Sequence, residues 1–330
     1  MCANCALVQL GPAGPPAIDE QGAVESATAI AHARRAVQSI MPEEDLHAGD
    51  TIIEIDSGHG GSWLPGFAEA GLVAHDPASS ADLVVDLHGL MHEADLDAAV
   101  AAHAARIAPG GRLICEFYYL GALVGDSLID TIRHGHYSYL SLTAASHVLG
   151  RHGLVVSRVQ RVPTFGGSLR VVARRRRDST AADASVRDLI SIERRSNLDN
   201  VVALEALDKR GRAAATEFRT LLVSAAKSGT SVAGYGAPSK AAVLLALADV
   251  DASLLPYTVD IAPAKTGCRI PGADVPIGPV EKLISDQPDI VVVLTWDIAG
   301  EVIAQLRRMA DGDWNPRYWV PLPKPGFISA

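Results

Sequence analysis

The sequence predicts an α/β protein of two domains, a doubly wound parallel sheet followed by a second, smaller α/β domain. The 330 residues are enough for two domains of ordinary size. Hydrophobic residues make up 48% and aromatic residues only 5%, so small apolar side chains dominate, as in helices packed closely on sheets. Predicted strands alternate with predicted helices, and each half of the chain contains a strand followed by a glycine-rich turn and a helix.

The first half reads as a linker followed by alternating helices and strands. Glycines and prolines mark the linker at residues 8–18. We expect helices at 21–40, 62–70 and 95–107, a glycine-rich turn at 57–61, and strands at 51–55, 72–75, 83–85, 112–116, 154–159 and 168–173.

The second half begins after a helical stretch predicted over 182–227. Its strands are expected at 231–233, 257–259, 290–294 and 318–320, with a second glycine-rich turn after the first of them. We therefore divide the chain into a leading segment (1–20), a first domain (21–178), a helical connector (179–228) and a C-terminal domain (229–330).

Composition argues against several classes of function. The net charge of −9 argues against general nucleic-acid binding, and the basic run at 174–177 is interpreted as a solvated linker. No apolar run reaches the roughly 20 residues that a membrane span needs. The first ten residues do not have the pattern of a signal peptide, so we expect a cytoplasmic protein.

The four cysteines include one C-x-x-C pair, Cys2 and Cys5. A structural zinc site needs four ligands, usually two such pairs, so we expect no zinc and no other metal site. The pair is then interpreted as free thiols in a frayed N-terminus.

The turn after the first strand has the form of a dinucleotide-binding turn. Glycines there allow a ligand to approach the backbone, and Asp76, after the next strand, is placed to hold ribose hydroxyls. A purely structural turn with a solvated aspartate is the alternative. All eleven histidines lie between His32 and His152, so histidine chemistry belongs to the first half.

A series of motifs resembles one known family. The motifs are, in order, EIDSGHG (54–60), HDP (75–77), ADLVV (81–85) with LMH (90–92), PGGRLICE (109–116), DTIRHGHYSY (130–139), GGSLR (166–170), GYGAPSK (234–240), VD (259–260) and TW (295–296). Together they resemble the S-adenosylmethionine (SAM)-dependent C-methyltransferases that act on nucleotide-linked 4-keto-6-deoxysugars. The resemblance runs from Cys2 to Lys324 and is most specific in the His-x-His-x-Ser-Tyr block and the GYGAPxK turn.

The resemblance implies a SAM-methyltransferase-like, Rossmann-like domain joined to a second, smaller Rossmann-like domain. It implies that a base removes the proton next to the 4-ketone and that the enolate takes the methyl group of SAM. His136 is the expected base, and His134, Tyr137 or Tyr139 is expected to orient the substrate or steady the enolate. The residues expected at the cofactor are Glu54, Gly58, Gly60, Asp76 and His92. The alternative is that the histidine block is a hydrogen-bonded loop.

The second glycine-rich turn is a candidate diphosphate cradle, because glycines, helix N–H groups and a lysine meet there. The resemblance assigns this domain to a nucleotide-sugar. The expected binding residues are Gly234, Tyr235, Gly236, Pro238, Ser239 and Lys240. A structural turn with Lys240 in water is the alternative.

The sequence departs from the family pattern in four respects. The first zinc pair is absent, Asp56 replaces the first glycine of the cofactor turn, and Arg133 and Gly135 replace a tyrosine and a glutamate. Only about six residues separate the strands ending near His75 and beginning near Leu83, whereas a crossover between parallel strands usually needs a dozen or more. The family has a helix and another strand here, so we expect an open, shallow cofactor site.

Three functions are consistent with the sequence. The first is the C-methyltransferase, and the second is a SAM-independent epimerase or isomerase that keeps His136. The third is a non-catalytic protein that binds a nucleotide-sugar. The sequence does not specify the sugar, the modified position, C- against O-methylation, or the oligomeric state.

Overall fold

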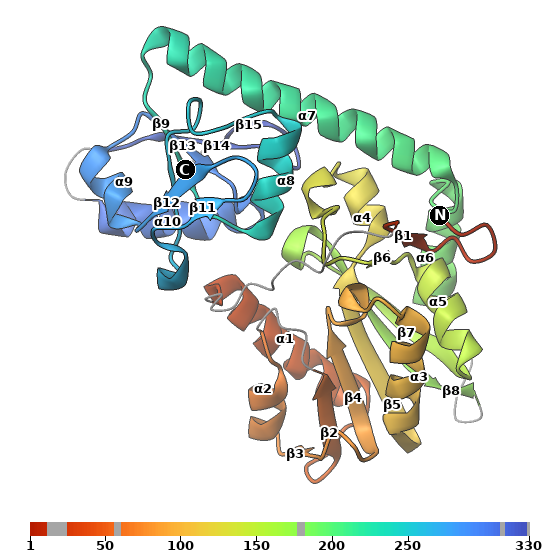
Figure 1. Ribbon diagram of the computed structural model, residues 1–330. Coiled ribbons are helices and arrows are strands. Elements are labelled where there is room, and N and C mark those ends of the chain that lie inside the picture. The colour runs from red at the N-terminus through yellow and green to blue at the C-terminus, as the bar shows by residue number, and fades with distance from the viewer. Residues whose placement is uncertain (12–24, 56–60, 177–181, 311–313, 329–330) are drawn as a thin grey trace. The chain divides into compact units, whose positions relative to one another are not determined.

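The structure is a computed structural model that describes residues 1–11, 25–55, 61–176, 182–310 and 314–328 (Figure 1). Most of the predicted linker and of the predicted glycine-rich turn at 57–61 lies outside these residues. The chain divides into two compact units. Unit 1 holds residues 1–21, 25–122 and 134–204, and unit 2 holds residues 22–24, 123–133 and 205–330. Residues 123–133 are therefore grouped with the second half of the chain.

Unit 1 is built on a six-stranded sheet of order β3-β2-β4-β5-β8-β7. The first four strands of that order run parallel, and β8 runs antiparallel to both neighbours. The strands are β2 (Thr51–Ile55), β3 (Val73–Ala74), β4 (Ala81–Leu87), β5 (Ile107–Tyr118), β7 (Leu154–Val162) and β8 (Ser168–Arg175). This order confirms a Rossmann-like first domain.

Helices cover both faces of this sheet (Figure 1). The helices of unit 1 are α1 (Ala27–Glu43), α2 (Leu64–Glu69), α3 (Leu96–Arg106), α5 (Leu142–Arg151) and α6 (Ala184–Arg195), and α4 (Leu120–Gly125) crosses the boundary with unit 2. Ala36, Ile40 and Phe67 of α1 and α2 pack on Leu83 and Ile114 of the sheet, which forms one buried core.

Unit 2 has a seven-stranded sheet of order β11-β12-β10-β9-β13-β14-β15 with antiparallel strands at both edges. Its strands are β9 (Val232–Tyr235), β10 (Thr258–Val259), β11 (Arg269–Ile270), β12 (Val275–Gly278), β13 (Ile290–Val293), β14 (Arg317–Val320) and β15 (Gly326–Ile328). Its helices are α7 (Val201–Ser228), which begins in unit 1, α8 (Ser239–Leu247), α9 (Glu281–Asp286) and α10 (Ala299–Met309). The second Rossmann-like domain is also confirmed.

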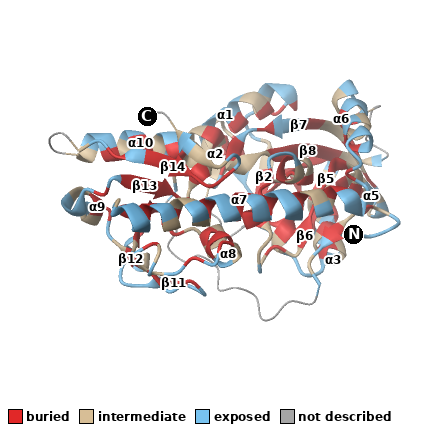
Figure 2. Cartoon of the chain, turned by 90° about the horizontal axis from the view of Figure 1, so that it is seen from above, coloured by how far each residue is buried: buried red, intermediate tan, exposed pale blue. Residues whose placement is uncertain are grey.

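The core of unit 2 lies between its sheet and α7 and α8. The rings of Phe218 on α7 and Trp319 on β14 stack with centroids 5.2 Å apart. Figure 2 shows β13 and β14 in red and much of α7 in pale blue. Because Phe218 and Leu222 of α7 are buried, one side of this long helix faces the core and another is exposed. The predicted helical stretch over 182–227 consists of two helices, because α6 ends at Arg195 and α7 begins at Val201.

The N-terminus is not frayed, which corrects the sequence-based expectation. Ala6 and Val8 are buried, and strand β1 (Val8–Gln9) pairs antiparallel with β6 (Ser138–Tyr139). Cys2 and Cys5 remain free thiols. Among the described residues no cluster of three or more potential ligands suits a metal ion. The N-terminal segment therefore stabilises β6, the strand that contains the end of the histidine block.

The short connection between β3 and β4 has a simple structural explanation. Strand β3 has only two residues, paired with the beginning of β2 at the sheet edge. The Asp82 carboxylate at the start of β4 accepts hydrogen bonds from the Thr51 backbone N–H (2.9 Å) and hydroxyl (2.7 Å). Because β3 ends so early, a short loop is enough to reach β4 on the other side of β2.

Candidate active site

The histidine block brings His136 into a buried cluster of rings in unit 1. His136 is 2% exposed, and its ring centroid lies 4.9 Å from His92, 5.6 Å from Tyr118 and 6.2 Å from Tyr139. Strand β5 supplies Tyr118, β6 supplies Tyr139, and the short 3₁₀ helix Leu90–His92 supplies His92. Three of the predicted site residues therefore lie together.

Gly135 orients His92 toward this cluster. Its carbonyl oxygen lies 2.7 Å from Nδ1 of His92, and since a carbonyl only accepts, Nδ1 carries the proton. The φ of Gly135 is 90°, which favours glycine over any other residue. The absence of the family's glutamate at this position thus has a backbone reason.

The other two members of the block face different surroundings. His134 is exposed and Tyr137 is half-buried. The Tyr137 backbone N–H donates to the Met91 carbonyl oxygen (2.8 Å), and the Tyr137 carbonyl accepts from Leu10 (3.2 Å). These bonds hold the segment between β1 and the His92 helix.

A small pocket of about 80 Å³ is lined by Tyr118 and by eight other residues of unit 1. The residues that line it are Ala29, His32, Gly61, Trp63, Leu87, His88, Glu116, Tyr118 and Phe165. They come from α1, the start of α2 and the carboxyl ends of β4 and β5, where ligands bind in open α/β sheets. Tyr118 both lines the pocket and contacts His136.

Glu116 is the charged centre of this pocket. Its Oε1 lies 2.6 Å from Nε2 of His32, and its Oε2 accepts from Nε of Arg170 at 3.1 Å. Arg170 is its direct partner in the β5–β8 ladder and lies over the Trp63 ring at 4.8 Å. Burial opposes ionisation of Glu116, but the His32 hydrogen bond and the Arg170 charge outweigh it and lower its pKa.

His88 also lines this pocket, although none of the motifs indicated it. It is 7% exposed, directly follows β4, and its ring lies 4.9 Å from Tyr118 and 5.0 Å from Phe165. Burial lowers the pKa of His88 to about 4, although Glu116 and Asp86 act in the opposite direction. Its position after a parallel strand was the one available sequence signal.

The residues predicted at the cofactor do not come together as a set. Glu54 Oε2 accepts the backbone N–H groups of Trp63 (2.8 Å) and Leu64 (3.0 Å), and so fixes the first turn of α2. Asp76 is exposed in the loop after β3, and its Oδ1 accepts from the Ala78 backbone (2.8 Å). His92 lies with His136, while Gly58, Gly60 and Asp56 lie outside the described residues.

One part of this region suits the reactive end of SAM. Gly61 borders the pocket, and its backbone N–H donates to the Glu25 carboxylate. The ring of Trp63 and the carboxylate of Glu116 suit a cationic group next to it. A pocket of about 80 Å³ has room for a few atoms only, which matches a reacting centre rather than a whole nucleoside.

The second glycine-rich turn, in unit 2, is tightly packed. A Cβ at Gly234 would lie 2.7 Å from Thr258 Oγ1, and one at Gly236 would lie 2.6 Å from Thr295 Cγ2. Both glycines are therefore required by neighbouring strands and loops, whatever else they do. The backbone N–H of Ala237 donates to Asp260 Oδ2 at 2.8 Å.

The remaining side chains of this turn are also engaged. Lys240 forms an ion pair with Asp297, and its Nζ lies 4.3 Å from the centroid of the Trp296 ring. Trp296 Nε1 donates to Oδ2 of Asp130 (2.8 Å), a carboxyl whose pKa is raised by burial. Tyr235 donates its hydroxyl to Gln305 Oε1 (2.8 Å). Pro238 and Ser239 begin α8. The alternative of Lys240 in water is therefore wrong.

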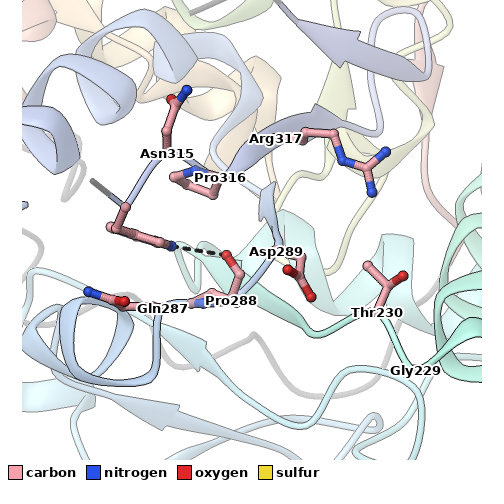
Figure 3. Close-up of a pocket in the computed structure, with 9 residues that line it drawn as sticks. Gly229, Thr230, Gln287, Pro288, Asp289, Asn315, Pro316 and Arg317 are labelled. Atoms are coloured by element: carbon pink, nitrogen blue, oxygen red, sulfur yellow. Dashed lines mark hydrogen bonds between the residues drawn. The ribbon is translucent and has the colours of Figure 1, made fainter. Parts of the chain in front are cut away.

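A larger cavity of about 670 Å³ lies elsewhere in unit 2 (Figure 3). The residues around it are Gly229, Thr230, Gln287, Pro288, Asp289, Trp314, Asn315, Pro316 and Arg317. It lies at the amino ends of β9, β13 and β14, whereas the glycine-rich turn follows the carboxyl end of β9. It contains none of the predicted site residues.

Comparison with known proteins gives a match to a family model over slightly less than half of the chain. Residues 163–323 match the family model described as "C-methyltransferase C-terminal domain". C-methyltransferase NovU from Streptomyces niveus is 28% identical over 345 residues, covering 93% of this chain and 80% of NovU. Within the described ranges, no helix is both long and apolar enough to cross a membrane.

Solved structures of methyltransferases resemble part of the chain more distantly. A methyltransferase in a complex with the Haloferax volcanii Trm112 activator is represented by a chain 15% identical, with a TM-score of 0.35 over 44% of this chain and 89% of that chain. The Burkholderia thailandensis 1,6-didemethyltoxoflavin-N1-methyltransferase is 16% identical, with a TM-score of 0.35 over 45% of this chain and 80% of its own.

Proposed function

We propose that this chain, a C-methyltransferase related to NovU, methylates the carbon next to the ketone of a nucleotide-linked keto-deoxysugar, with SAM as methyl donor and His136 as base. The relationship to NovU covers 93% of the chain and supports carbon as the methylated atom. The observation that carries the catalytic assignment is the burial of His136 among His92, Tyr118 and Tyr139.

The proposed reaction begins when His136 takes the proton from the carbon next to the ketone. The electron pair of that C–H bond forms a carbon–carbon double bond, and the ketone oxygen receives the negative charge. The surrounding rings exclude water, which strengthens electrostatic interactions with that charge. SAM, when bound, would supply an electrophilic methyl group for the nucleophilic carbon and would leave as S-adenosylhomocysteine, whose sulfur keeps the electron pair of the broken S–CH3 bond, while the ketone forms again. His136 then returns its proton to solvent.

His92 and Tyr139 support this step as positioning residues. His92 is fixed by its bond to the Gly135 carbonyl and packs edge-on against His136, which restricts the orientation of the base. Tyr139 is held by the β1–β6 pairing. A base held in one orientation loses less entropy when it meets the substrate carbon.

In the cofactor site, Gly61, Trp63 and Glu116 would hold the methyl-bearing end of SAM. Gly58 and Gly60 remain the proposed contacts for the rest of the molecule, with Glu54 fixing the helix that follows them. The exposed Asp76 remains a candidate for the ribose. Strand β3, at the edge of the sheet, has only two residues, so few side chains there could enclose the nucleoside of SAM. We therefore still propose an open cofactor site.

In unit 2, the turn at Gly234–Lys240 remains the proposed site for the nucleotide part of the substrate. A diphosphate would replace Asp260 at the Ala237 N–H and Asp297 at Lys240, because both carboxylates already occupy positions that suit an anion. Binding would thus exchange one set of charge-assisted hydrogen bonds for another, which favours moderate affinity.

Methyl transfer from labelled SAM to a panel of nucleotide-linked 4-keto-6-deoxysugars tests the proposal. We expect a product with the label on carbon, identified by mass spectrometry and by NMR of the new methyl group. A label on oxygen would contradict the enolate mechanism. A substrate that exchanges a proton with solvent but never gains a methyl group would favour the epimerase alternative, which the two-residue β3 strand also favours.

A further inference from the structure

We propose that His88 donates a hydrogen bond to the oxygen of the substrate ketone as negative charge develops there. This inference rests on the function proposed above and adds a catalytic residue to it. Neither the motifs nor the comparisons assign a role to His88.

The first observation is that His88 has hydrogen-bonding capacity that the folded chain does not use. Its Nδ1 and Nε2 atoms are both buried and have no hydrogen-bond partner among the residues that the structure describes. The nearest carboxylate oxygen there is Glu116 Oε1, 3.8 Å from Nε2, which is too far for a hydrogen bond. A buried polar group without a partner destabilises the fold, so a ligand that pairs with it is favoured.

The second observation is the backbone of His88. Its φ is 64°, in the left-handed region, where asparagine, aspartate and histidine are the most frequent residues besides glycine. The backbone N–H donates to the Glu116 carbonyl oxygen at 2.7 Å, which fixes this conformation. The side chain is thereby directed into the pocket, between the rings of Tyr118 and Phe165.

The third observation concerns charge. The Glu116 carboxylate is already compensated by Arg170 and His32, so it does not need a proton on His88. Burial keeps the His88 imidazole neutral at pH 7, since its pKa is about 4. One ring nitrogen then carries a hydrogen and the other a lone pair. A neutral donor stabilises an enolate without having to give up its proton.

The fourth observation is the position relative to the base. Tyr118 contacts both rings, with centroids 4.9 Å from His88 and 5.6 Å from His136. A carbon and the ketone oxygen next to it are separated by two bonds, so base and donor must lie near each other without touching. The contact of both rings with Tyr118 places His88 and His136 in the same region of unit 1. Phe165 and Trp63 keep the donor in an apolar setting, where hydrogen bonds to charge are strong.

Two substitutions at His88 distinguish the loss of a hydrogen-bond donor from the loss of side-chain packing. His88→Asn keeps a neutral N–H donor and tolerates the left-handed backbone, whereas His88→Gly tolerates the backbone and removes the donor. The exposed His147→Gln on α5 is the control. The measurement is exchange of solvent deuterium into the carbon next to the ketone, followed by methyl transfer, with thermal melting of each variant.

We expect His88→Gly to lower kcat for both reactions by about 10²–10³-fold, the usual effect of removing one oxyanion donor, with little change in the KM for SAM. His88→Asn should stay within about tenfold of the wild type. Full activity of His88→Gly, or equal loss in both variants, overturns the inference while the proposed function stands. A wild-type protein that neither exchanges nor methylates overturns both.

Discussion

At the scale of single residues, the pocket in unit 1 holds the buried titratable side chains of Glu116 and His88 in different electrostatic environments. Glu116 has Arg170 and His32 as partners, whereas the imidazole of His88 has no hydrogen-bond partner in the part of the chain that the structure describes. The electrostatic consequence is that Glu116 stays ionised and His88 stays neutral, although both are buried. Their environments give two neighbouring titratable groups different roles, which is typical of catalytic sites.

His88 should make the stability of the folded chain depend on pH. In the unfolded chain its pKa returns to the ordinary 6.5, but in the folded chain it is about 4. Between these values the unfolded chain binds a proton that the folded chain does not, so the free energy of unfolding falls as the pH falls from 6.5 to 4. The largest loss from this group is about 3 kcal/mol.

Urea denaturation of the wild type and of His88→Asn at several pH values measures this effect. The difference in the free energy of unfolding between the two proteins should change as the pH falls through that window and stay constant above it. A difference that does not vary with pH would show that the pKa of His88 is the same in the folded and the unfolded chain, which contradicts the effect of burial.

At the scale of secondary-structure elements, β5 and β8 are joined across their ladder by the buried pair Glu116 and Arg170. Arg170→Met removes the charge but keeps much of the side-chain volume. It leaves Glu116 buried without its arginine partner, so we expect a loss of about 3–5 kcal/mol in the free energy of unfolding.

The matched control is Arg151→Met, because the ion pair of Arg151 with Asp97 is largely exposed. We expect a loss below about 1 kcal/mol there. Both values come from chemical denaturation at pH 7. Equal effects of the two substitutions would mean that the Glu116–Arg170 pair contributes no more than a surface pair.

Elements with a local sequence pattern could be predicted, and those that depend on distant partners could not. Strand β2 occupies the predicted residues Thr51–Ile55, because an apolar β-branched run between polar turns has few alternatives. Strand β1 was missed, since a two-residue strand has no period and forms only because β6 is available to pair. The break between α6 and α7 was missed too, because the intervening residues contain neither proline nor glycine.

Residues of the candidate site that belong to local motifs could be predicted, and those defined by distant neighbours could not. His136, His92 and Tyr139 belong to recognisable motifs, and the structure brings them together. His32 and Glu116 are 84 residues apart in sequence, and no local spacing links them. His88 was missed because an unpaired imidazole is defined by its neighbours in space. The role of Lys240 in binding remains a prediction, with Asp297 now known as its partner.

At the scale of the whole molecule, the boundary between the two units is crossed more than once, because residues 123–133 belong to unit 2 and residues 134–204 to unit 1. Residues 123–133 leave unit 1 to join unit 2, where the 3₁₀ helix Ile129–Thr131 packs against α8. Trp296 donates to Asp130 in the same unit. Unit 2 therefore depends on a segment that precedes the histidine block by only a few residues, which couples its folding to that of unit 1.

A fragment of residues 205–330 should consequently be less stable than unit 2 of the intact chain. Without residues 123–133, the indole N–H of Trp296 loses its acceptor and part of α8 loses its cover. We expect a broad thermal transition by near-ultraviolet circular dichroism, sharpened when a peptide of residues 123–133 is added in excess. A sharp transition at the temperature of the intact chain would contradict this dependence.

The proposed role of His136 in forming an enolate can be tested by solvent exchange. The measurement is deuterium incorporation into the carbon next to the ketone of a nucleotide-linked keto-deoxysugar, without SAM, by the wild type, His136→Gln and His147→Gln. We expect exchange by the wild type and by His147→Gln, and a rate about 10²–10⁴-fold lower in His136→Gln. Exchange by His136→Gln at the wild-type rate would contradict this role.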